Sequence, residues 1–138
     1  MLDIAKILWD VSKGLFDARG KLASARRDRR DRVATYIDKL AELIEKVAAS
    51  LRLNQYPHGS CAELHALGER MEQTLMGLLP NEEARLYQSE VLKIWEIEQL
   101  FGQLQGMTRE KAESKLIQLL EAAGNFRAIA AHLRVTAS

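Results

Sequence analysis

The stretch ARRDRRDR (residues 25–32) decides how the first third of this chain folds. On both sides of it, apolar residues recur at helical spacing. From Ile4 to Leu51 they fall within about 60° of one direction on a helical wheel. A loop in the middle would normally reset that phase, and no proline or asparagine-glycine turn occurs before Asn54. The pattern therefore predicts one long N-terminal helix over residues 2–52.

A helix of that length is hard to fit into a compact monomer. At 1.5 Å per residue, about 48 residues would span roughly 72 Å, whereas a compact domain of this size is under roughly 40 Å across. Either the molecule is elongated and dimeric, or the helix breaks within residues 25–32, where the apolar stripe is lost for nearly two turns. Pairs such as Arg27–Asp31 suit a helix there and bring no turn chemistry. The sequence favours the continuous helix, and a hairpin stays open as the alternative.

Proline, glycine and capping signals divide the rest of the chain into shorter helices. Ser60 with Glu63 matches a capping box, and Thr108 suits a helix N-cap. Pro80–Asn81 marks a break, and Gly124–Asn125 has the chemistry of a C-cap turn. The predicted helices cover about 60–79, 82–104, 108–123 and 126–134. We therefore expect residues 1–138 to form a single all-α domain, an elongated helical bundle.

Composition limits the class of protein. The chain has 138 residues, 47% apolar and 28% charged, which fits one globular domain. Its formal net charge of +1 gives no basic footprint for nucleic acid or an anionic membrane. The N-terminus lacks a signal-peptide pattern, because charges interrupt every short apolar run. The single cysteine excludes an internal disulfide and fits a reducing compartment, so we expect a cytoplasmic protein.

The first candidate site is a cluster of metal-ligating residue types. His58, Cys61 and His65 are spaced H-x2-C-x3-H, and these side chains suit zinc, with His132 as a distant fourth ligand. Real structural zinc sites usually show paired ligands at both ends. The alternative is that Pro57 and its neighbours form a turn, and that Cys61 packs as a small apolar residue. We favour this alternative and expect neither a metal nor a cofactor.

The second candidate is a charged patch formed by Arg26, Arg27, Arg29, Arg30 and Arg32. Arginine forks match phosphate geometry. The alternative is a solvated helix segment stabilised by intrahelical ion pairs, and no aromatic residues interleave to stack on bases. Two of the arginines, Arg26 and Arg29, point along the apolar stripe. If they are buried they need a carboxylate, for which Glu98 is a candidate.

The third candidate is a second apolar edge on the N-terminal helix, formed by Leu2, Trp9 and Phe16. With this edge, apolar surface covers more than half of the circumference of residues 2–23. A helix of this kind is buried centrally, pairs with a partner or lies on a membrane. Its polar face carries both signs of charge, whereas interfacial helices are usually rich in Lys and Arg. We therefore expect central burial or a homotypic interface.

The tail contains Ala123–Phe126, Ile129–Ala131, Leu133, Val135–Thr136 and Ser138. In these positions residues 121–138 resemble the first part of a winged helix-turn-helix reader of the LysR type. The resemblance implies two helices joined by a turn, with a recognition helix that enters the major groove after them. No such helix follows here, so we expect an alanine-rich helical hairpin in place of a DNA reader.

Motifs for catalysis are absent from the sequence. It contains no P-loop, G-x-G-x-x-G, H-E-x-x-H or G-x-S-x-G pattern, so we expect no enzymatic activity. The predicted function is a non-enzymatic protein–protein interaction module, an adaptor or regulatory domain. It would self-associate as a homodimer through its N-terminal helix and bind an unidentified protein. The alternatives are a membrane-associating bundle that uses residues 2–23, and nucleic-acid binding through Arg26–Arg32.

Overall fold

The computed structural model describes residues 3–135, apart from the side chains of residues 95, 96, 98 and 99. It confirms the predicted all-α fold, and no strand forms within that range. The elements in chain order are α1 (Ile4–Asp17), α2 (Arg19–Ala23), α3 (Arg27–Arg52), α4 (His58–Gly68), α5 (Met71–Thr74), α6 (Asn81–Leu92), the 3-10 helix η1 (Lys93–Glu96), α7 (Ile97–Gly106) and α8 (Arg109–Val135).

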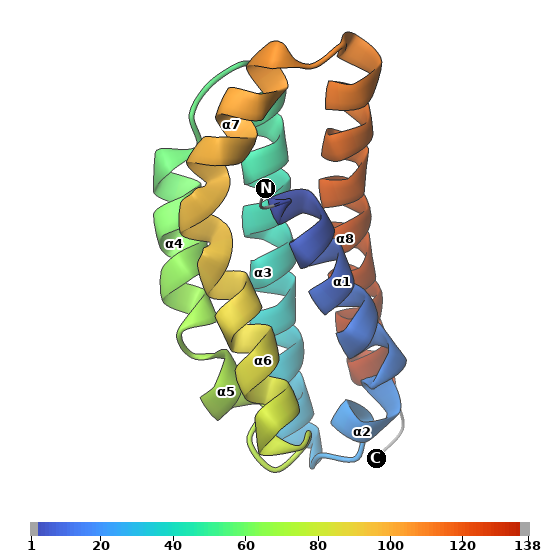
Figure 1. The fold of residues 1–138 in the computed structure, drawn as a ribbon. Helices are drawn as coiled ribbons and strands as arrows, with labels where there is room; N and C mark the ends of the chain where they lie inside the picture. The colour runs from blue at the N-terminus through green and yellow to red at the C-terminus, as the bar shows by residue number, and fades with distance from the viewer. Residues whose placement is uncertain (1–2, 136–138) are drawn as a thin grey trace.

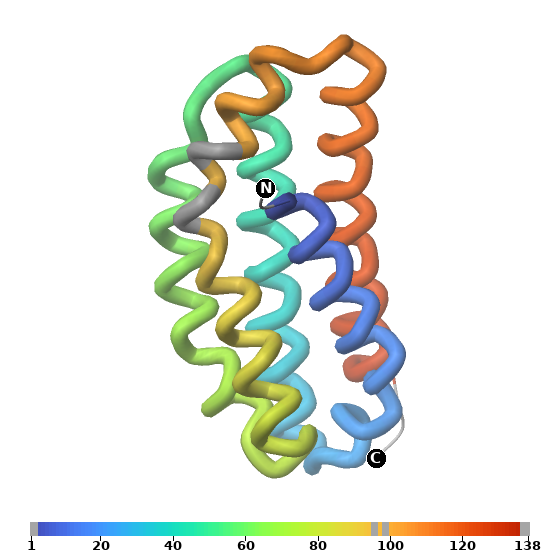
Figure 2. Tube along the Cα trace, viewed as in Figure 1, coloured from blue at the N-terminus to red at the C-terminus, as the bar shows by residue number. Residues whose placement is uncertain are grey.

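The long helices α3 and α8 form the centre of the bundle. They pack against each other more extensively than any other pair, and α1 packs next most extensively, on α8. Helix α4 lies against α3, and α6, η1 and α7 follow one another as a rod beside α4 (Figures 1 and 2). The core is built from the apolar faces of α1, α3 and α8, with further side chains from α4 to α7.

The predicted continuous helix over residues 2–52 is wrong, because the chain folds back between α2 and α3. Ala18 (φ −93°, ψ 8°) and Ser24 (φ −73°, ψ −11°) stay near helical angles, whereas Arg26 (φ −63°, ψ 155°) is extended. Since so few residues leave helical geometry, the spacing of apolar residues hardly changes across the reversal and the stripe keeps its phase. The hairpin buries both halves of the stripe in one core, which an unbroken helix could not do within a monomer.

The predicted helix over residues 60–79 is also wrong in its bounds. Helix α4 begins at His58, directly after Pro57, and no side chain caps it, so Ser60 is not an N-cap. The helix ends at Gly68, where it approaches α6 closely. A Cβ at Gly68 would lie 2.9 Å from the Val91 Cγ1 atom, so only glycine fits there without a shift of α6. The helix predicted over 82–104 is likewise interrupted, by η1.

The two C-terminal helices predicted over 108–123 and 126–134 are in fact one helix, α8. Gly124 lies in its middle and does not end it. The Asn125 side chain donates a hydrogen bond to the Ser12 hydroxyl of α1 at 3.1 Å, and Phe126 is buried. Burial of the residues that follow thus outweighs the roughly 1 kcal/mol that a mid-helix glycine costs. Because no turn forms here, the helix-turn-helix resemblance of the tail does not extend to its structure.

The predicted N-cap at Thr108 is confirmed, because its hydroxyl accepts a hydrogen bond from the Lys111 amide at 3.3 Å. We expect Thr108→Ala to lower the free energy of unfolding by about 0.5–1 kcal/mol, since the first turn of α8 loses a partner for one of its free amides. Urea denaturation measures the change. Thr35→Ala, at an exposed position inside α3, is the control and should cause no loss. An equal effect of both variants would contradict the capping role.

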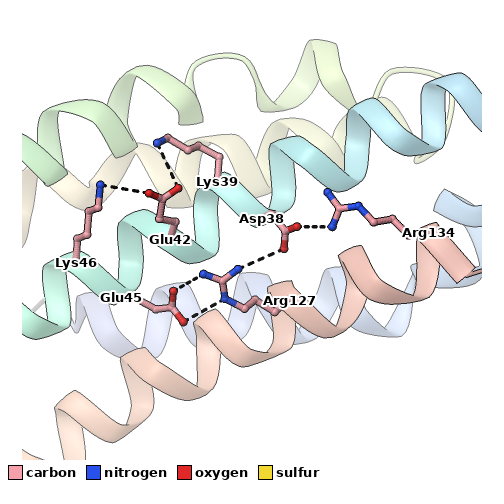
Figure 3. A network of polar contacts seen from close by, with 7 residues as sticks. All are labelled: Asp38, Lys39, Glu42, Glu45, Lys46, Arg127 and Arg134. Carbon is pink, nitrogen blue, oxygen red and sulfur yellow. Dashed lines mark hydrogen bonds and ion pairs between the residues drawn. The ribbon is translucent and has the colours of Figure 1, made fainter.

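An ion-pair network joins the outer edges of α3 and α8 (Figure 3). Arg127 lies 3.2 Å from Glu45 (Nε to Oε2) and 3.6 Å from Asp38, which also pairs with Arg134. The four side chains are 30–46% exposed, so water screens these pairs and their contribution to stability is modest. Their main effect is to fix the register of α8 along α3.

Candidate functional site

The structure gives the predicted metal ligands separate environments. His58 is exposed at the start of α4, Cys61 is buried, and the half-buried His65 has its Nδ1 atom 3.1 Å from a Glu69 carboxylate oxygen. Burial raises the pKa of the Cys61 thiol to about 12, so its thiolate, the form that binds metals, is disfavoured. Within residues 3–135, no group of three or more His, Cys, Asp or Glu side chains has the geometry to hold a metal ion. His132, on α8, completes no such group.

The five arginines of the charged patch do not form one surface. Arg26, Arg27 and Arg32 are exposed, and Arg32 makes only a loose pair with Asp28 at 3.9 Å. Arg29 donates hydrogen bonds to the backbone carbonyls of Thr74, at 3.2 Å, and Met76, so it ties the start of α3 to the loop after α5. The carboxylate suggested as its partner, Glu98, has its side chain outside the described part of the structure.

Arg30 is the arginine that the helical wheel missed, because it lies about 80° from the direction of the main stripe. The buried face of α3 is wider than that stripe and also includes Ala34, Ile37 and Ala41 on the side of Arg30. The Arg30 side chain is 5% exposed. One guanidinium nitrogen donates to the Ala23 carbonyl at 3.4 Å, and Nε has no hydrogen-bond partner among the described residues. Arg30 therefore belongs to the interior between α2 and α3 and is not available to a phosphate.

The second apolar edge of α1 is partly covered by the chain itself. Leu2 lies outside the described residues, whereas Trp9 and Phe16 are half-buried and pack against the core. The Arg19 guanidinium lies 4.1 Å from the Phe16 ring centre and the Lys13 ammonium 5.5 Å from it, and both are cation–π contacts. Phe16 is thus covered by its own helix and by α2. Trp9, in contrast, faces an opening in the surface.

That opening is a cleft of about 1570 Å³ at one end of the bundle. Trp9 of α1 and Leu51 of α3 line it on one side, Phe101 and Leu104 of α7 on another, and the first half of α8 on a third. From α8 the lining includes Ile117, which is 46% exposed. These apolar groups come from four helices, and only the fold brings them together.

The cleft exists because α1 begins further along the bundle than α8 does. Ser12 of α1 contacts Asn125 of α8, and Asp3, just before α1, contacts Lys115, so the first turn of α1 lies level with about residue 116 of α8. The first two turns of α8, roughly 10–12 Å, extend beyond α1. The described N-terminus lies part-way along the bundle in Figure 1. Along these two turns, no fourth helix among residues 3–135 lies between α3, α7 and α8. Sequence periodicity could not reveal this, because it assigned residues 2–52 to a single helix.

The rim of the cleft carries both signs of charge in equal number. The basic residues are Lys6, Arg52, Arg109 and Lys115, and the acidic residues are Asp10, Glu110, Glu113 and Glu121. Lys6 pairs with Asp10 at 2.9 Å, and Arg52 pairs with Glu113 at 2.6 Å. Lys115 also reaches back to Asp3, just before α1. Partial burial alone would raise the pKa of Asp3, but hydrogen bonds from Lys115 and the Lys6 amide outweigh it and hold that pKa below its ordinary value.

The lining of the cleft combines apolar side chains with charged ones. Neither cysteine nor histidine lines the cleft, and two of its four carboxylates are held in the ion pairs with Lys6 and Arg52. An apolar floor with a polar rim is the usual anatomy of a protein–protein contact.

The fold defines the class of this protein as an all-α helical bundle. In comparisons with known proteins, no protein-family model, curated protein or solved structure matches the chain. Across the described residues, each helix is too short or too polar to cross a membrane. Function must therefore be argued from the cleft and from the exposed faces of the helices.

Proposed function

We propose that this protein is a non-enzymatic interaction module, an adaptor or regulatory domain, whose cleft binds an amphipathic helix of a partner protein. The observation that carries the proposal is that α1 begins about two turns after the start of α8, so that a cleft opens there beside Trp9. The cleft therefore has the walls of a helical bundle without its last helix, which is the geometry of helix-in-groove recognition.

The dimensions and chemistry of the cleft support this occupant. The part of α8 beyond α1, roughly 10–12 Å long, accommodates about two helical turns of a partner helix, which would then continue beside Trp9. Trp9, Phe101, Leu104 and Ile117 supply apolar contacts for one face of such a helix. The mixed charges of the rim would meet a helix whose flanks also carry both signs, with neither nucleic acid nor an anionic surface favoured.

A cavity-filling variant tests the proposal. The probe is a displayed library of amphipathic peptides of about four turns, selected on the full chain and measured by calorimetry. Ala112 lines the cleft and is half-buried. We expect Ala112→Phe to fill part of the cleft and to weaken peptide binding by at least tenfold, about 1.4 kcal/mol, with little change in stability.

Ala66→Phe is the matched control, because Ala66 is exposed on α4, outside the lining of the cleft. It should leave the affinity of the same peptides unchanged. If no peptide is selected, or if both variants bind like the parent chain, the cleft is not a helix-binding site.

The structure gives less support to three other interpretations of the sequence, namely self-association through the N-terminal helix, membrane association and nucleic-acid binding. Self-association through the N-terminal helix was based on a helix too long for a monomer, and α1 has only 14 residues. Membrane association through residues 2–23 would require α1 to leave the bundle, where Ile4, Leu8 and Leu15 are fully buried. Nucleic-acid binding through residues 26–32 would rest on the exposed arginines alone, because Arg29 and Arg30 point into the fold.

A further inference from the structure

Helix α8 is apolar on two faces. Its inner face is buried against α1 and α3. Its outer face carries a second stripe, in which every residue is exposed: Ile117, Leu120, Gly124, Ala128, Ala131 and Val135. At 100° per residue these six positions fall within an arc of roughly 80°. These six residues are called the outer stripe. They depart from the usual pattern, because the free face of a surface helix is normally polar.

The large members of the outer stripe are well exposed. Ile117 is 46%, Leu120 39% and Val135 80% exposed, so no other part of the described chain covers them. Single exposed apolar residues are ordinary, but a row of them along nearly five helical turns marks an interaction surface. The spacing of three or four residues between successive members is that of a helix-to-helix contact.

Gly124, at the centre of the outer stripe, is not required by the fold of its own chain. A Cβ placed there would meet nothing within 4 Å. A glycine inside a helix costs roughly 1 kcal/mol relative to alanine. By contrast, a Cβ at Gly14 would lie 2.4 Å from the Tyr87 hydroxyl, so that glycine serves an internal contact. Gly124 permits a close approach of another backbone from outside.

The outer stripe is complementary to itself when a second copy lies antiparallel across it. With Gly124 on the two-fold axis, residues whose numbers are symmetric about 124 face each other. Ile117 then meets Ala131 of the second copy, and Leu120 meets Ala128. At these two steps a large side chain faces a small one, and the two glycines meet at the crossing point, which allows the backbones to approach closely. At the ends of the stripe, Val135 faces Glu113 of the second copy.

Charge is compatible with the same orientation. In an antiparallel pair centred on Gly124, Glu113 of one copy lies beside Arg134 of the other. Within its own chain, Glu113 also pairs with Arg52 and Arg134 with Asp38. Antiparallel pairing also aligns the two helix dipoles favourably.

We propose that the outer stripe of α8 is the interface of an antiparallel homodimer centred on Gly124. The dimer and the peptide-binding site proposed above share Ile117 and the rim residue Glu113, and neither proposal requires the other. Residues of α1 play no part in this interface.

Gly124→Leu separates dimerisation from folding. Leucine favours the helix and meets open space in its own chain, so the monomer should gain about 0.5–1 kcal/mol in free energy of unfolding. The same side chain blocks the approach of a second copy. In sedimentation over a concentration series, we expect the parent chain to rise from 15.6 kDa towards twice that mass, and Gly124→Leu to weaken dimerisation by at least roughly tenfold.

Gly102→Leu is the matched control, because Gly102 also lies within a helix, α7, and its Cβ would meet nothing within 4 Å. It should dimerise like the parent chain. A parent chain that stays monomeric throughout the series, or a Gly124→Leu variant that dimerises normally, overturns the proposal.

Cysteine cross-linking tests the orientation. In the antiparallel dimer two copies of Ile117→Cys would be roughly 21 Å apart along the helix, as would two copies of Ala131→Cys, so neither variant alone forms a disulfide. A mixture of the two variants should cross-link under mild oxidation. Cross-linking of either variant with itself, and not in the mixture, would show a parallel pair and reject the antiparallel one.

Discussion

Replacing Phe126 with alanine is expected to lower the free energy of unfolding by about 3–5 kcal/mol, because a large buried ring is removed and a cavity remains. Phe126 is 1% exposed and is the largest of the fully buried side chains. It lies in the second half of α8, which packs on both α1 and α3. A loss of this size is a large part of the 5–15 kcal/mol that stabilises a typical domain.

The same measurement needs a control at an exposed apolar position. Leu86→Ala is the control, because Leu86 is 55% exposed on α6, and it should change stability by no more than about 0.5 kcal/mol. Urea denaturation of both variants gives the comparison; equal effects would contradict the placement of Phe126 in the core.

Replacing Arg30 with methionine is expected to raise the free energy of unfolding by about 1–3 kcal/mol. The guanidinium is 5% exposed, makes one long hydrogen bond at 3.4 Å, and leaves Nε without a partner within the described residues. Among those residues it has no ion pair to offset the loss of hydration. Methionine has a similar length, adapts to irregular space and removes the buried charge.

Two further arginine variants complete this experiment. Arg29→Met should destabilise the protein, because the hydrogen bonds to the Thr74 and Met76 carbonyls are lost. Arg27→Met, at an exposed position, should change stability by no more than about 0.5 kcal/mol. If Arg30→Met instead unfolds more easily than the parent chain, the buried guanidinium has a stabilising partner and the reasoning from its open Nε fails.

The candidate site could be predicted only in part. Trp9 was recognised as lying outside the main stripe, and it does line the cleft. Periodicity places Phe101 and Leu104 on the inward face of the helix predicted over residues 82–104, and it does not single out Ile117. What joins these residues is the point at which α1 begins beside α8, a relation between helices that no local window of sequence contains. Likewise, the spacing of His58, Cys61 and His65 shows which residue types could bind a metal but not how buried each one is. Burial of Cys61 raises the pKa of its thiol and so disfavours the thiolate that binds metals.

The sequence by itself determined the helical class, the apolar faces that form the core, and local signals such as the N-cap at Thr108. These follow from periodicity and from side chains that reach backbone groups within one turn. The tertiary structure alone decided where helices stop. It broke the predicted helix over residues 2–52 near Arg26 and carried α8 through Gly124, in each case against the local pattern. The physical reason is that helix signals are worth about 1 kcal/mol each, whereas burying a single large apolar side chain is worth more.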